Sequence, residues 1–278
     1  MAVSLDEVMV PMKGGAREAK RAEARAAGKQ TKGPAGYQEV GCATVSFYDR
    51  EGERLDTLRF ARMPEPKKAT LKSILTAEVR TVLAQRPDLN VVKVADGAKD
   101  NWTYLEALVP EGEERVDFYH ATEQLKAALD AAYGESAPKG QAQFKKLRHV
   151  LLEDTDGVDK VIRALIYLRT KHSRRKRIAE VLSYFRRHRR RMDYAEAVSR
   201  DLPIGSGVVE AACKTLATQR MKRSGMRWRH AGGQAILTLR ALVQSHRFEH
   251  AWSLLSATYR ADVTLPGNAT ELPWKRAA

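Results

Sequence analysis

The sequence predicts an α/β fold, with a mixed sheet flanked by helices and a large helical addition. Three observations lead to this prediction. A Val-rich run near the amino terminus precedes two runs of aromatic and β-branched residues, which is typical of three successive strands. Short Val-rich runs then alternate with helical stripes, as in sheets covered by helices. From about residue 139 the pattern becomes purely helical and strongly charged.

The first three predicted strands lie within the first 63 residues. Residues 3–10 alternate in polarity and are rich in Val, and residues 37–49 and 53–63 carry aromatic and β-branched side chains. Arg50-Glu51-Gly52 separates the last two runs, which predicts an antiparallel hairpin. Residues 13–36 are basic, rich in Ala and Gly and without large apolar side chains, so we expect a solvated, flexible connection there.

Strands and helices alternate in the next part of the chain. Apolar side chains at helical spacing predict a helix over residues 67–85. The Val-rich run 90–95 predicts a strand that ends at Asp96-Gly97, and residues 116–120 predict another strand before a helix through Leu125.

Four regions follow from these patterns. Residues 1–138 form the first part of the sheet core, and residues 139–202 form a basic helical insertion. Residues 203–262 supply the carboxyl-terminal helices of the core, including the one that carries Glu210. The tail 263–278 has prolines and no periodicity, so it is expected to be loose.

Composition narrows the class of partner and the compartment. The chain has 49 Lys and Arg against 34 Asp and Glu, a net charge of +15, which favours nucleic acid over the weaker alternative of a membrane surface. No run approaches the roughly 20 apolar residues of a membrane span, and the amino terminus lacks the pattern of a signal peptide, so we expect a cytoplasmic protein. The two cysteines, Cys42 and Cys213, are too few for a disulfide framework and are expected to be small buried residues.

Three acidic residues occupy settings that suit a metal site. Asp6 lies within the first predicted strand, Asp96 follows the strand 90–95, and Glu210 lies in the first turn of a helix that Ser206 can cap. Carboxylates are the ligands that Mg²⁺ prefers, and two such ions stabilise phosphoryl transfer. Each acid also fits an ordinary role, as a solvated strand residue, a turn residue or a partner of a helix dipole.

Several sequence blocks resemble those of a known family. The block LPIGSGVVEAACKTLATQRMKRSGMRW, followed by GGQAILTLRALVQS, resembles the carboxyl-terminal signature of ISKra-type insertion-sequence transposases. The blocks VSLDEVMVPMK, VVKVADGAKDNW and VDFYHATEQL are similar to its upstream blocks and occur in the same order. The resemblance implies a ribonuclease H-like catalytic core and a DDE triad of Asp6, Asp96 and Glu210. It also implies a pair of Mg²⁺ ions, with Mn²⁺ as the alternative.

The same resemblance implies a function. Such an enzyme cleaves DNA at the ends of an insertion sequence and transfers the freed strand into target DNA, acting as a homo-oligomer in a synaptic complex. Asp117-Phe118-Tyr119-His120 is similar to the Cys/Asp-x-x-His element of Mutator-like transposases, which implies that His120 positions the scissile strand or the leaving group. A lone His at the start of a helix is otherwise a cap or a surface residue.

Two other functions stay open. Family members usually carry a further amino-terminal region, whereas Met1 lies five residues before Asp6, so the chain is expected to be a truncated copy or to have a misassigned start. An inactive remnant that only binds DNA would fit that expectation. A ribonuclease H-like nuclease or junction resolvase would share the metal site but cut without joining ends.

Two basic clusters predict contacts with DNA phosphates. Between Arg163 and Arg191, twelve Lys or Arg residues accompany one acid, Glu180, and a second cluster follows Glu210. The predicted DNA-binding residues are Lys171, Arg174, Arg175, Lys176, Arg177, Arg187, Arg190, Lys214, Arg220, Lys222, Arg223, Arg227 and Trp228. A solvated basic face is the alternative for such runs.

Aromatic residues leave a further choice between DNA contact and core. Trp228 and Trp102 each fit either a base-stacking role or a place in the core. Trp252 and Leu255, in the last predicted helix, are expected to be core residues.

Overall fold

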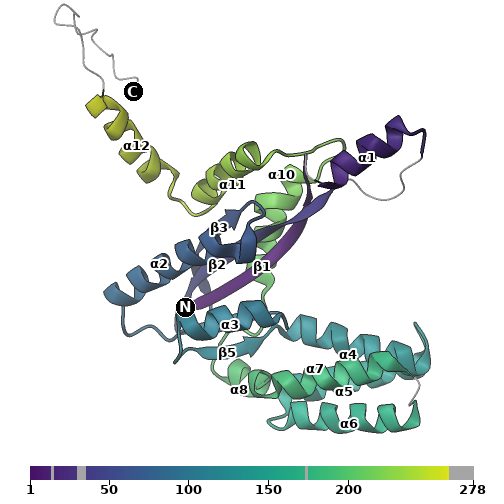
Figure 1. The fold of residues 1–278 in the computed structure, drawn as a ribbon. Helices are drawn as coiled ribbons and strands as arrows, with labels where there is room; N and C mark the ends of the chain where they lie inside the picture. Colours follow the sequence, from purple (N-terminus) through teal and green to yellow (C-terminus); the bar gives the residue numbers. More distant parts are fainter. Residues whose placement is uncertain (14–15, 30–35, 173–174, 263–278) are drawn as a thin grey trace, which may run out of the picture.

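The computed structural model describes residues 1–13, 16–29, 36–172 and 175–262, and a five-stranded sheet lies at its centre (Figure 1). The strand order is β3-β2-β1-β4-β5. The antiparallel neighbours β1, β2 and β3 form a meander, and β4 and β5 run parallel to β1. The strands are β1 (Ala2–Pro11), β2 (Tyr37–Tyr48), β3 (Arg54–Arg62), β4 (Val92–Ala95) and β5 (Glu113–Val116). The predicted mixed sheet flanked by helices is confirmed.

Helices cover both faces of the sheet because successive strand residues point to opposite sides. Val3 and Leu5 of β1 pack on one side with Leu71 of α2, whereas Val10 packs on the other side with Val209 of α9. The first face is covered by α2 (Ala69–Gln85), α3 (Lys99–Leu108) and α4 (Phe118–Tyr133). The second face is covered by α9 (Gly207–Ala212), a π-helical turn (Cys213–Thr218), α10 (Gln219–Met221) and α11 (His230–Gln244).

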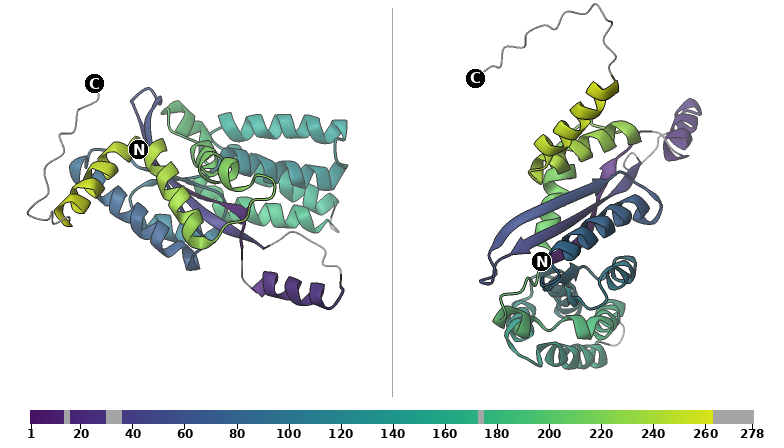
Figure 2. Two further views of the ribbon diagram at one scale, coloured as in Figure 1. Left: turned by 90° about the horizontal axis from the view of Figure 1, so that it is seen from above. Right: turned by 90° about the vertical axis from the view of Figure 1, so that its left-hand side faces the viewer.

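The basic insertion is a set of helices that packs on α4 (Figure 2). It comprises α5 (Pro138–Glu153), α6 (Gly157–Lys171), α7 (Lys176–His188) and α8 (Tyr194–Ser199). Ile178, Val181, Leu182 and Phe185, the apolar face of α7, are fully or almost fully buried. They belong to the same hydrophobic cluster as the α2 side of the sheet, so the insertion is fixed to the sheet by a continuous core.

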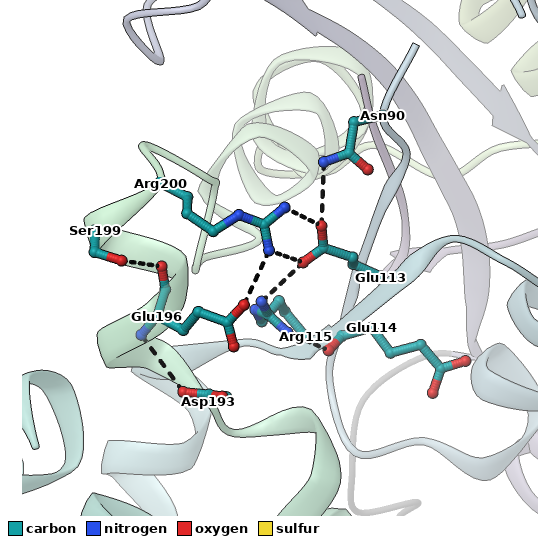
Figure 3. A network of polar contacts seen from close by, with 8 residues as sticks. All are labelled: Asn90, Glu113, Glu114, Arg115, Asp193, Glu196, Ser199 and Arg200. Atoms are coloured by element: carbon teal, nitrogen blue, oxygen red, sulfur yellow. Dashed lines mark hydrogen bonds and ion pairs between the residues drawn. The ribbon is translucent and has the colours of Figure 1, made fainter. Parts of the chain in front are cut away.

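A polar network joins the edge strand β5 to α8 at the end of the insertion (Figure 3). The Glu113 carboxylate accepts hydrogen bonds from Arg200, at 2.7 and 3.2 Å, from Arg115 at 3.0 Å and from Asn90 at 3.1 Å. Burial alone would raise the pKa of Glu113, but the hydrogen bonds from Asn90 and Arg200 outweigh it, and the pKa is lowered. The ionised carboxylate therefore holds the chain where it leaves α8 toward α9.

Two predicted segments differ from the structure. Residues 116–120 were expected to form a strand, but β5 ends at Val116 and α4 begins at Phe118. The Asp117 side chain accepts a hydrogen bond from the His120 backbone N–H, so its capping ends the strand here. The segment 13–36, expected to be a flexible connection, contains the helix α1 (Ala16–Ala26). Ala, Arg, Glu and Lys are strong helix formers, and a helix without large apolar residues forms here apart from the core.

The prediction that Trp252 and Leu255 are core residues is wrong. They lie on α12 (Phe248–Asp262), a helix that extends from α11 away from the sheet (Figure 1), and are 57% and 48% exposed. Their helical spacing predicts an apolar face on the helix but does not predict which element packs against that face. Cys42 and Cys213 are both buried, as expected. Among the described residues, no helix has both the length and the apolarity that crossing a bilayer requires.

Candidate active site

Asp6, Asp96, His120 and Glu210 line one cavity of about 260 Å³. Its remaining lining residues are Leu5, Glu123 and Ser206. The residues come from β1, the end of β4, the first turns of α4 and the start of α9, which are far apart in sequence. A larger cavity of about 630 Å³ between α11 and α12 is lined mainly by apolar side chains and holds no carboxylate. The small cavity is the candidate site because it brings together Asp6, Asp96 and Glu210.

Sheet register explains why the two aspartates lie close together. Parallel pairing of β1 with β4 places Ser4 opposite Val94. Asp6 and Asp96 are each two residues farther on, so both side chains point to the same side of the sheet. Neighbouring strands lie under about 5 Å apart, and this spacing brings the two carboxylates to one end of the sheet.

Helix α9 supplies the third carboxylate. Ser206, just before α9, donates its hydroxyl to Glu210 Oε1 over 2.9 Å. The π-helical turn that follows carries Cys213, whose thiol donates to Asp6 Oδ2 over 3.5 Å. Hydrogen bonding with Cys42 and burial raise the pKa of the Cys213 thiol, which stays protonated and able to donate. These contacts connect the helix to β1 at the cavity.

Asp6 shows the electrostatic character of the site. Burial raises the pKa of its carboxyl group above the ordinary value. Hydrogen bonds from the Glu7 backbone and from Cys213 offset part of this shift. The negative charges of Asp96 and Glu210 add to it, because like charges disfavour ionisation of a neighbour. A site that gathers negative charge in this way favours a bound cation.

The donor set suits a hard divalent cation. Asp6, Asp96, Glu123 and Glu210 offer only carboxylate oxygens, the ligands that Mg²⁺ and Mn²⁺ prefer. Asp6, Asp96 and Glu210 accept hydrogen bonds from their own chain. Within the described ranges, no three His, Cys, Asp or Glu side chains form a group that could hold an ion as they stand.

Asp117 holds two segments of the cavity wall in place through backbone hydrogen bonds. Its side chain is fully buried, with Oδ1 accepting the His120 backbone N–H over 2.6 Å and Oδ2 accepting the backbone N–H of Ser206. The backbone N–H of Phe118 also donates to Ile204 over 2.9 Å. The Asp-x-x-His element thus links the start of α4, which carries His120, to the loop that leads to Glu210.

The turn after β4 is held by two further elements. Asp96 Oδ1 accepts the Ala98 backbone N–H at 3.0 Å and the Asn101 amide at 3.4 Å. Gly97 lies against the Tyr184 ring of α7, where a β-carbon would overlap the ring. The Tyr184 hydroxyl is buried without a hydrogen-bond partner among the described residues. The insertion therefore packs directly on the backbone beside Asp96.

The predicted DNA-binding residues belong to two separate parts of the chain. Lys171, Arg175, Lys176, Arg177, Arg187 and Arg190 are exposed on the insertion, and Lys214, Lys222, Arg223 and Arg227 are exposed after Glu210. Arg174 lies outside the described residues. Arg220 is half-buried, its guanidinium 5.3 Å from the Trp228 ring centre.

Both ambiguous tryptophans have structural contacts. Trp228 is half-buried, packs against the core and donates its indole N–H to Met221 over 3.1 Å. Its backbone pairs with the end of β1. Trp102 is buried and donates to the Asp96 carbonyl over 2.6 Å, so it supports the turn after β4 from the core side.

Sequence reasoning did not nominate Glu123 or Tyr184. Glu123 follows His120 by three residues on a helix, a spacing that places both on one face, and this signal was present in the sequence. Tyr184 gave no signal, because its contact with Gly97 joins residues 87 positions apart.

Comparison with known proteins does not assign the chain to a family. No family model matches it, and no curated protein matches its sequence.

Proposed function

We propose that this protein is a DDE transposase that carries out metal-dependent phosphoryl transfer on DNA. The observation that carries the proposal is the shared cavity: Asp6, Asp96 and Glu210 all line it, from two parallel strands and a late helix. The strand order, with an antiparallel meander followed by two strands parallel to β1, fits a ribonuclease H-like core. The sequence blocks that resemble ISKra-type transposases, and the net charge of +15, support the same function.

In this proposal Asp6, Asp96 and Glu210 would hold two Mg²⁺ ions, with Mn²⁺ as the alternative. When bound, such ions stabilise the attacking and leaving oxygens of a phosphoryl transfer. His120 and Glu123 lie in the same cavity and hydrogen-bond the leaving oxygen or the attacking group. Hydrolysis at the end of the element frees a 3′-hydroxyl, which then attacks a phosphodiester bond of the target DNA. Exposed Lys and Arg side chains bind the phosphates of both DNA segments.

The test is cleavage and joining of DNA that carries the terminal repeats of the element. Wild-type protein with Mg²⁺ should nick the repeat ends and join them to a target plasmid, and Asp96→Ala should lose both activities by at least about a thousandfold. Asp88→Asn is a suitable control, because its carboxylate pairs with Arg86 at the surface. Equal cleavage by wild type and Asp96→Ala would refute the triad, and cleavage without joining would indicate a nuclease.

A further inference from the structure

A large, mostly exposed aromatic side chain precedes a residue that lines the cavity. Tyr119 follows Phe118 at the start of α4 and is 56% exposed. Its neighbour His120 lines the cavity, as does Ser206, the residue after Gly205. The Tyr119 ring lies against Gly205, where an added β-carbon would be 2.9 Å from Cε2 and 3.0 Å from Cδ2. Tyr119 and the glycine that it contacts are therefore each one residue along the chain from a residue that lines the cavity.

The position of the ring is fixed although most of it is solvated. The buried Phe118 ring meets it edge-to-face, with centroids 5.7 Å apart and an interplanar angle of 77°. The backbone carbonyl of Tyr119 accepts a hydrogen bond from Thr122 over 2.8 Å. Gly205 provides a bare backbone surface on which the ring rests. A ring that is positioned in advance binds a planar partner with little loss of conformational freedom.

We infer that Tyr119 stacks on an unpaired nucleobase beside the scissile phosphate, so that the preferred substrate is DNA that is locally open at the cleavage point. Aromatic side chains beside a phosphate-binding groove bind single-stranded DNA in this way, with little dependence on base identity. A base inside a duplex already stacks on its neighbours and cannot reach the ring. This inference rests on the proposed function, because it places the scissile phosphate in the cavity.

The experiment compares binding of two DNA probes in Ca²⁺ buffer. One probe is a fork, a duplex that ends in two unpaired strands, with 2-aminopurine as the first unpaired base. The other is a fully paired duplex with 2-aminopurine in its interior. Wild-type protein and Tyr119→Phe should bind the fork about tenfold more tightly than the duplex and quench its fluorescence. Tyr119→Leu should lose the preference and the quenching, while its affinity for the duplex is unchanged, since phosphate contacts supply that affinity.

Tyr167→Leu is the matched control, because Tyr167 is 62% exposed on α6 in the insertion and should behave as wild type. The inference is overturned if Tyr119→Leu keeps both the fork preference and the quenching, or if wild type binds neither probe. If Tyr119→Leu melts below wild type, Tyr119→Gln makes the same test with the same two outcomes. Fork preference and fluorescence quenching are both measured without cleavage. Equal cleavage by wild type and Asp96→Ala would therefore refute the triad without changing the outcome of the stacking experiment.

Discussion

Replacement of Gly97 by Ala tests how the insertion packs on the turn that carries Asp96. A β-carbon at residue 97 would overlap Cε2 of Tyr184 and lie 3.2 and 3.4 Å from Cδ2 and Cζ. The ring has to retreat by about 1 Å to restore ordinary van der Waals separation. Phe185 and His188 pack against it, with ring centroids 5.7 and 4.9 Å away, so there is little room to do so. Overpacking of this kind costs about 1–3 kcal/mol.

The assay is urea denaturation of a double-mutant cycle. Gly97→Ala should lose about 1–3 kcal/mol in the wild-type and Tyr184→Phe backgrounds, but less than about 0.5 kcal/mol with Tyr184→Leu, which removes the ring. Gly232→Ala is the control, because nothing lies within 4 Å of its added β-carbon. The same loss in all three backgrounds would refute the packing of α7 on the turn after β4.

Three further predictions concern charge in and around the site. Asp6→Asn should raise the free energy of unfolding at pH 7 by about 0.5–2 kcal/mol and abolish cleavage. Because the folded-state pKa of Asp6 is raised, wild type loses stability as the pH rises through that pKa. Urea denaturation at pH 7 and pH 3 should therefore show the gain in stability of Asp6→Asn only at pH 7. Burial and the nearby Arg191 lower the pKa of His188 from 6.5 to about 4. The free energy of unfolding of wild type should therefore fall by up to about 3 kcal/mol as the pH falls from 6.5 to 4. The same dependence of stability on pH in His188→Phe as in wild type would contradict this. Asp117→Ala should lower the free energy of unfolding by about 2–4 kcal/mol in thermal and urea unfolding, because it leaves the backbone N–H groups of His120 and Ser206 unpaired. An unaltered melting temperature would count against the role of Asp117 in linking α4 to the loop before α9.

The local patterns of the sequence were sufficient to predict most strands and helices. Val-rich alternation and the Arg50-Glu51-Gly52 turn predicted the meander, and helical spacing predicted the buried face of α7. The end of β5 was missed because the run VDFYH has strand-forming residues, while the Asp117 cap depends on hydrogen bonds with residues 120 and 206. Capping overrode propensity at that point.

Long-range contacts explain which parts of the site were not foreseen. Asp6, Asp96 and Glu210 were nominated from element ends and a family resemblance, and their common cavity depends on the parallel register of β1 and β4. The contact of Tyr184 with Gly97 depends on how the insertion folds back, which no local pattern encodes. The exposure of Trp252 likewise follows from the direction of α12 and not from its spacing.

The most direct test of the central claim is calorimetric titration of the protein with Mn²⁺. If Asp6, Asp96 and Glu210 share divalent cations, wild type binds Mn²⁺, and both Asp96→Asn and Glu210→Gln bind it at least about tenfold more weakly. The surface variant Asp88→Asn keeps wild-type affinity. Equal Mn²⁺ affinity in wild type, Asp96→Asn and Glu210→Gln would contradict the account.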